Sequence, residues 1–96
     1  MTDLTVFARI EPKPEHYHEA LTAIRGIVDA TRTEPGCRRF EVNAGQPGDP
    51  ALYLVEWWRS DAALDAHYAQ DYTRAVFAAY EGWLARPVEV TKMRPA

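Results

Sequence analysis

The stretch Ala51-Leu52-Tyr53-Leu54-Val55-Glu56-Trp57-Trp58-Arg59 carries large apolar side chains at most of its positions. Aromatic and β-branched residues are enriched in strands, so we predict a strand over residues 51–59. A strand with one face in water alternates apolar and polar residues. This one places Leu52, Leu54 and Trp58 on one side and Tyr53, Val55 and Trp57 on the other. Both of its faces are therefore predicted to be covered.

Three further segments read as strands. Residues 4–10 are rich in β-branched and aromatic types and end before Pro12 and Pro14. Residues 37–44 form a second strand, and the Gly/Pro-rich turn at 45–50 joins it to residues 51–59 as a hairpin. Residues 88–93 form the last strand.

Helical spacing accounts for the rest of the chain. Apolar residues recur at i, i+3, i+4 and i+7 over 15–33, which predicts one helix there. Glu34-Pro35-Gly36 ends it, because a proline disfavours helix at the preceding residue and Gly36 can adopt a positive φ. Ser60 is a natural N-cap for a short helix over 61–69. A further helix over 72–85 is predicted to turn Val76, Phe77, Tyr80, Trp83 and Leu84 inward.

The resulting order, β-α-β-β-α-β, is that of a ferredoxin-like α+β domain with an antiparallel sheet and helices on one face. The 96 residues fit one domain, 1–96. The net charge is −3 with no basic stripe, which argues against a nucleic-acid partner. We find no membrane span and no export signal, and the single cysteine fits a reducing compartment, so we predict a cytoplasmic protein.

The apolar side chains on the second face of the sheet predict a homodimer. Phe7, Tyr53, Val55 and Trp57 fall on the side away from the helices. Exposing such a patch is costly, since burying one large side chain contributes about 1.5–3 kcal/mol. Packing against a second copy with two-fold symmetry is the commonest way to cover it.

Several runs resemble the antibiotic biosynthesis monooxygenase (ABM) domain family, whose well-understood members are quinol and anthrone monooxygenases. These runs are residues 30–41, Glu56-Trp57-Trp58-Arg59-Ser60, Ala63-Leu64-Asp65-Ala66-His67, and Arg86-Pro87-Val88-Glu89-Val90. The resemblance covers nearly the whole chain. It implies a dimeric α/β barrel with a pocket between sheet and helices, and oxidation of quinols, anthrones or polyketide aromatics by O2 without flavin, haem or metal.

The sequence departs from the family pattern after His67. The family often shows Ser-Pro-His-Phe where this chain has Ala69-Gln70-Asp71-Tyr72, so a second histidine is absent. Haem-degrading relatives carry an asparagine on the first strand and a histidine late in the third helix. This chain has Phe7-Ala8-Arg9 and Val76-Phe77-Ala78-Ala79-Tyr80 there, which argues against haem degradation.

His67 is the candidate catalytic residue. On the short helix it shares a side with Ala63 and Leu64, which points it at the sheet. An imidazole exchanges protons near neutral pH, so it can take the proton of a phenolic substrate. The resulting anion can then pass an electron to O2, and the two radicals recombine. The alternative is that His67 is a hydrogen-bonded packing residue.

Four aromatic residues are candidate walls for a flat substrate, although each could be ordinary core: Trp58, Tyr72, Phe77 and Tyr80. Arg9 could hold an anionic substrate, or pair with an acid such as Glu41 or Glu56. The leading interpretation is a cofactor-independent monooxygenase. Two alternatives remain: a dimeric binding or stress-response protein without turnover, and an isomerase or cyclase on the same scaffold.

Overall fold

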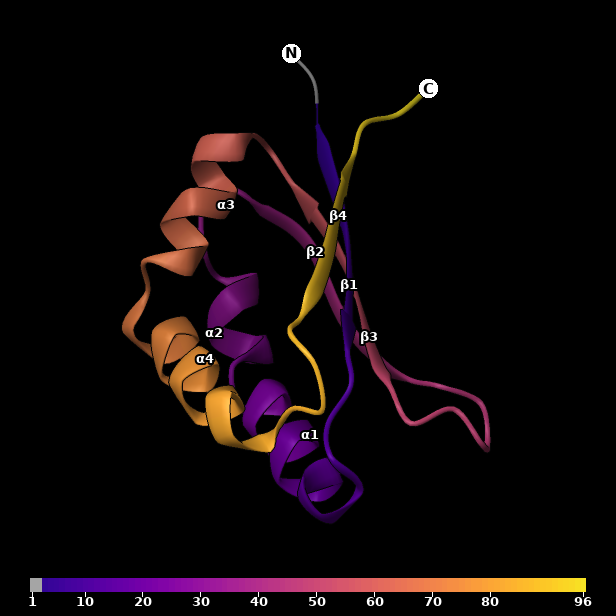
Figure 1. The fold of residues 1–96 in the computed structure, drawn as a ribbon. Coiled ribbons are helices and arrows are strands. Elements are labelled where there is room, and N and C mark those ends of the chain that lie inside the picture. The colour runs from indigo at the N-terminus through magenta and orange to yellow at the C-terminus, as the bar shows by residue number, and fades with distance from the viewer. Residues whose placement is uncertain (1–2) are drawn as a thin grey trace.

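A computed structural model describes residues 3–96 as a four-stranded sheet with all its helices on one side (Figure 1). The elements, in chain order, are β1 (Leu4–Ile10), the 3₁₀ turn η1 (Pro14–His16), α1 (Tyr17–Arg25), α2 (Val28–Arg32), β2 (Cys37–Ala44), β3 (Leu52–Trp58), α3 (Asp61–Tyr68), α4 (Asp71–Trp83) and β4 (Glu89–Met93). The strand order is β2-β3-β1-β4, and every neighbouring pair is antiparallel. The predicted ferredoxin-like fold is confirmed.

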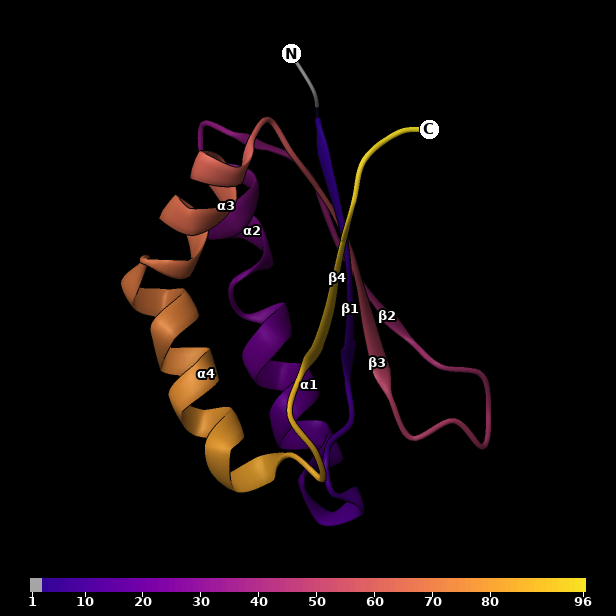
Figure 2. The ribbon, with the colours of Figure 1, turned by 45° about the horizontal axis from the view of Figure 1, so that its top comes forward.

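The two central strands owe their place to the alternation of their side chains. In β1 and β3 every second residue is buried, and these residues face the helices. Leu4 lies opposite Trp58 and Ile10 opposite Leu52, so the two buried rows are in register. The rotated view in Figure 2 shows the helical layer separated from the outer face by the whole sheet. The core therefore lies on one side of the sheet only.

The single helix predicted over 15–33 is wrong, because the segment breaks into α1 and α2 around Gly26 and Ile27. Glycine is about 1 kcal/mol worse than alanine in a helix. The N–H of Ile27 bonds to the carbonyl of Ile24 at 3.3 Å, a tighter i to i−3 turn. Burial of Ala20, Ile24, Ile27 and Thr31 continues across the break, so the predicted inward face is retained.

The turn before β2 places α3 against the sheet. Gly36 was predicted to adopt a positive φ, but among residues 3–96 only Gly48 does so. The requirement for glycine at position 36 is steric instead, since a Cβ there would lie 2.2 Å from the Cβ of Ala63 in α3. Ser60 caps α3 as expected, accepting a hydrogen bond from the N–H of Ala63 at 3.1 Å. The close approach of Gly36 to Ala63 places α3, and with it His67, beside Glu34.

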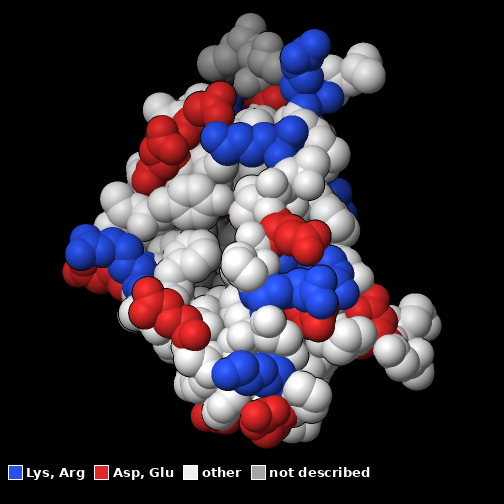
Figure 3. All heavy atoms as spheres, in the orientation of Figure 1, with Lys and Arg blue, Asp and Glu red and all other residues white. Residues whose placement is uncertain are grey.

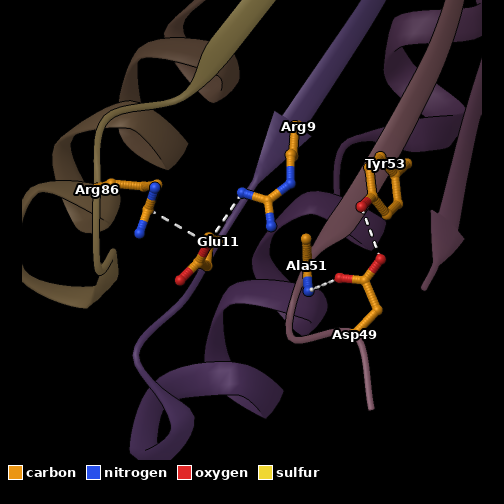
Figure 4. Close-up of polar contacts among 6 residues, drawn as sticks. All are labelled: Arg9, Glu11, Asp49, Ala51, Tyr53 and Arg86. Carbon is orange, nitrogen blue, oxygen red and sulfur yellow. Dashed lines mark hydrogen bonds and ion pairs between the residues drawn. The ribbon is translucent and has the colours of Figure 1, made fainter. Parts of the chain in front are cut away.

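Arg9 pairs with neither Glu41 nor Glu56, the two partners predicted for it if it does not bind an anionic substrate. Its guanidinium donates to the Oε1 of Glu11 at 2.9 Å, and Arg86 approaches the same oxygen at 3.2 Å (Figure 4). Alternation along β1 puts Arg9 on the outer face of the sheet, whereas Glu56 is buried on the inner face. Arg9 therefore serves an ion-pair cluster at the end of β1, outside the helix-side core.

Phe77 differs from its predicted inward position, since its side chain is 42% exposed near the middle of α4. Val76 and Tyr80 are buried as expected. Phe77 packs edge-on against Tyr68 of α3 at the margin of the core, with ring centroids 5.9 Å apart.

In residues 3–96 no helix has the length and apolar content needed to cross a membrane.

Candidate functional site

A narrow pocket lies between the inner face of the sheet and the helical layer. It contains about 420 Å³ of empty space, including its mouth. The residues that line it come from all four strands, from α1, α3 and α4, and from the turns beside α1 and β4. Most of its lining is aliphatic or aromatic. Figure 3 shows a hollow between the helices and β4, bordered mainly by uncharged atoms. Such a pocket suits a small apolar molecule with few polar groups.

His67 reaches this pocket from the buried face of α3. Leu64 and His67 are the buried residues of that helix, and His67 is 3% exposed. Its ring lies 4.8 Å from the ring of Trp58 and 5.5 Å from that of Phe40, measured between centroids. These aromatic neighbours hold the imidazole plane while leaving one edge on the pocket wall.

A carboxylate fixes the orientation of this histidine. Nδ1 of His67 lies 2.9 Å from Oε2 of Glu34, and both side chains are almost fully buried. The hydroxyl of Tyr72 donates to the same oxygen at 2.5 Å. Burial and the adjacent carboxylate raise the pKa of Tyr72 to about 12, so the phenol keeps its proton and donates it.

This arrangement leaves the second ring nitrogen for chemistry. A carboxylate only accepts hydrogen bonds, so Nδ1 of His67 carries the proton that faces Glu34. Nε2 then has a free lone pair, and among residues 3–96 it has no hydrogen-bond partner. The Glu34 and His67 pair can therefore act as a base toward a molecule in the pocket, with Glu34 stabilising the imidazolium that forms.

Glu56 is a second buried acid on the pocket wall. It is 4% exposed, and its Oε1 accepts a hydrogen bond from the indole N–H of Trp58 at 2.9 Å. No cation in residues 3–96 forms an ion pair with it. Burial raises the pKa of Glu56 to about 7, despite the opposing effect of the indole, and the charge of Glu34 adds to the rise. A neutral carboxyl near pH 7 can donate a proton.

Thr73 adds one more polar atom to the lining. Its Oγ1 is buried on α4 and has no hydrogen-bond partner among residues 3–96. An unmade bond at a buried hydroxyl costs about 1–3 kcal/mol. Thr31 has a similarly unpaired hydroxyl but does not line the pocket. Of these two hydroxyls, only that of Thr73 could form its missing hydrogen bond with an oxygen of a molecule bound in the pocket.

The sequence-predicted site residues fall into two groups. His67, Phe77 and Tyr80 line the pocket, and the hydroxyl of Tyr80 is engaged with the carbonyl of Ala20 at 2.9 Å, so Tyr80 offers its ring. Trp58 and Tyr72 do not line it. Trp58 is fully buried beneath His67, and Tyr72 bonds to Glu34, so each lies behind the wall.

Sequence reasoning missed Glu34, Glu56 and Thr73. The strand alternation contained the signal for Glu56, since it occupies the same side of β3 as Leu54 and Trp58. For Glu34 no local signal exists, because its partner His67 lies 33 residues away and is brought to it by tertiary contacts such as the approach of Gly36 to Ala63.

The chain can now be placed among known proteins. A model of the family described as antibiotic biosynthesis monooxygenase matches residues 3–86, nearly the whole chain. The chain belongs to this family. The resemblance drawn from residues 30–41, 56–60, 63–67 and 86–90 is thereby confirmed.

Individual relatives agree with this assignment. The chain is 35% identical over 96 residues to "Putative monooxygenase Rv0793" of Mycobacterium tuberculosis, covering 96% of this chain and 90% of that protein. The crystal structure of Rv0793 superposes with a TM-score of 0.91 at 30% identity, over 98% of this chain and 95% of that one.

Two further proteins are similar over most of this chain. An uncharacterized Synechocystis protein, sll1783, is 28% identical over 87 residues; the match covers 91% of this chain but spans only 59% of that protein's length. The structure of PA3566 from Pseudomonas aeruginosa gives a TM-score of 0.93 at 26% identity, covering 100% of this chain and 96% of that one.

Proposed function

We propose that this protein is a cofactor-independent monooxygenase that uses O2 to oxidise a small quinol-like or polyketide aromatic compound, with His67 as the catalytic base. One observation carries the proposal. The Nδ1 side of His67 is fixed by Glu34, which leaves Nε2 free at the wall of a mainly apolar pocket. Family membership and the monooxygenase name of the mycobacterial relative support the reaction type.

The chemistry begins with the loss of a substrate proton. Nε2 of His67 takes the phenolic or benzylic proton, and the developing imidazolium is stabilised by the carboxylate of Glu34. The electron-rich anion gives one electron to O2, and the two radicals join to form a C–O bond. Phe77 and Tyr80 offer aromatic surface to the ring, and the apolar lining excludes water from the reactive anion.

The overall reaction balances without any external reductant. The substrate loses two hydrogens in total and gains one oxygen atom of O2, and the second oxygen atom leaves as water. Nothing in this sequence of steps draws on flavin, haem or a metal ion.

Oxygen uptake tests the proposal directly. We expect the protein, treated with chelator, to consume O2 with at least one member of a panel of hydroquinones and anthrones, and His67→Ala to be slower by about 100-fold or more. His18→Ala, at an exposed histidine of α1, is the matched control and should keep the full rate. Equal rates for His67→Ala and wild type would show that His67 is not the catalytic base.

The same panel separates the alternative functions. Conversion under strictly anaerobic conditions would indicate an isomerase or cyclase, because those reactions need no O2. Thermal stabilisation by a compound that is never converted would indicate a binding protein, since a ligand selective for the folded state raises its stability.

We further propose that the functional unit is a homodimer formed through the outer face of the sheet. Phe7 and Trp57 remain 40% and 38% exposed on that face, and the Phe7 ring stacks on Tyr53 with centroids 5.6 Å apart. Thr5 lies between Trp57 and Met93 in the ladder, so the apolar surface continues onto β4. A second copy packed against this surface would cover it.

Sedimentation at micromolar concentration tests the dimer. Wild type is expected to sediment as a dimer, and Trp57→Glu as a monomer, because the substitution places a charge on the apolar face. Ala78→Glu, at an exposed position of α4, is the matched control and should remain dimeric. A wild-type monomer at this concentration would contradict the proposal.

A further inference from the structure

Glu56 occupies a position that the mechanism above leaves without a role. It projects from β3 into the same pocket as His67, and the indole of Trp58 links the two residues. The indole N–H donates to Oε1 of Glu56 at 2.9 Å, and the indole ring packs 4.8 Å from the imidazole. The pocket therefore presents two different proton-transfer groups to one molecule.

The environment of Glu56 favours a protonated carboxyl. The side chain is 4% exposed and has no cationic partner in residues 3–96. The titratable side chains that line the pocket with Glu56 are His67 and Tyr68 on α3 and Tyr80 on α4. Glu34 acts on it through its charge, and the ammonium of Lys92 on β4 lies 3.2 Å from Asp61. A buried carboxyl with only a neutral donor beside it holds its proton to higher pH.

We infer that Glu56 is a second catalytic residue, which gives its carboxyl proton to the oxygen that leaves as water. This inference rests on the proposed function. After O2 has joined the substrate carbon, the imidazolium of His67 gives its proton to the distal oxygen, so His67 is neutral again and that carbon carries one hydrogen and an O–O–H group. His67 removes the remaining C–H proton, the C–H electron pair becomes the second bond of a carbonyl group, and the O–O bond breaks.

The departing hydroxide then takes the proton of Glu56 and leaves as water. The Glu56 carboxylate is finally reprotonated with the proton that His67 removed from carbon, which returns both residues to their starting states. No oxidant other than O2 enters, and no reductant is consumed. An acid at this position matters because hydroxide is a poor leaving group in an apolar pocket.

Glu56→Gln tests this role because glutamine keeps the size and the hydrogen-bond acceptor but has no proton to give. On a substrate that wild type oxidises, we expect kcat to fall by about 100-fold. We also expect the substrate to accumulate as an adduct carrying both oxygen atoms, detected by mass spectrometry after acid quench. His67→Ala should give no such adduct, because it stops the reaction before O2 is added.

Glu15→Gln is the matched control, since Glu15 is an exposed residue of η1, away from the pocket and from the outer face of the sheet, and it should behave as wild type. Circular dichroism tests whether Glu56→Gln is folded. If the variant is unfolded, Glu56→Asp replaces it and should retain part of the wild-type rate. A folded Glu56→Gln with kcat within threefold of wild type and no adduct overturns the role of Glu56 alone. A wild type inactive on the whole panel overturns the proposed function, and the inference with it.

Discussion

Glu34→Gln is expected to lower kcat for the aromatic substrate by about 100-fold or more, although Glu34 does not line the pocket. Its carboxylate accepts hydrogen bonds from Nδ1 of His67 and from the hydroxyl of Tyr72. When Nε2 takes a substrate proton, the imidazolium needs a buried negative charge beside it, and a neutral amide provides none. Glutamine can also donate to Nδ1, which would place the resting proton on Nε2 and block the base.

The chain offers a matched control for this substitution. His16 and Glu19 form a second carboxylate–histidine pair, with Nδ1 2.7 Å from Oε1, on the exposed side of η1 and α1. Glu19→Gln should leave kcat unchanged. Tyr72→Phe removes one of the two hydrogen bonds to Glu34 but keeps the charge, so we expect a loss well below that of Glu34→Gln.

A second measurement makes the positioning role of Glu34 independent of any substrate. Nitrogen-15 chemical shifts of the His67 ring report which nitrogen carries the proton. Wild type is expected to show the Nδ1–H form, and Glu34→Gln a substantial population of the Nε2–H form. A folded Glu34→Gln with the wild-type tautomer and kcat within threefold of wild type would remove Glu34 from the catalytic arrangement.

Much of the fold could be predicted because it depends on local patterns. The richness of residues 4–10 and 51–59 in β-branched and aromatic side chains identified the two central strands, and Ser60 marked the start of α3. The break in the first helix was harder to foresee. The apolar spacing runs through it unchanged, and the poor helix propensity of Gly26 alone does not end a helix whose inner face is well packed.

The candidate site was predictable only where one residue carried its own signal. His67 stood out as a histidine on the inward side of a short helix. Glu56 did not, because a charged residue is expected at the surface, and it was considered as a partner for Arg9. In fact the two side chains are on opposite faces of the sheet, as the alternation of buried residues along β1 and β3 requires.

Tyr72 shows a different limit of sequence reasoning. It was predicted as an aromatic wall for a flat substrate, but the fold brings its phenol to Glu34, 38 residues away in the chain. Trp58 likewise does not face the pocket. Its ring packs against His67, and its indole N–H donates to Glu56. Both residues were predicted to contact the substrate, but neither lines the pocket, and their contacts depend on tertiary packing that no local pattern specifies.

The stability of the protein should depend on pH through Glu56. Its pKa is about 7 in the folded state, raised by burial from about 4.5 in the unfolded chain. A carboxyl whose pKa rises on folding binds its proton more tightly in the folded state. Its contribution to stability is therefore fully present below pH 4.5 and is lost as the pH rises through 7. At 1.36 kcal/mol per pKa unit, the loss amounts to about 3 kcal/mol.

Urea denaturation of wild type and Glu56→Gln from pH 5 to pH 8, at one protein concentration, measures this effect. The variant has no carboxyl to ionise at position 56. As the pH rises, its free energy of unfolding should therefore increase relative to that of wild type by up to about 3 kcal/mol across this range. Glu15→Gln, at an exposed position of η1, should follow the wild-type curve. Parallel curves for wild type and Glu56→Gln would show that Glu56 is ionised throughout, and a carboxylate without its proton could not act as the acid that releases water.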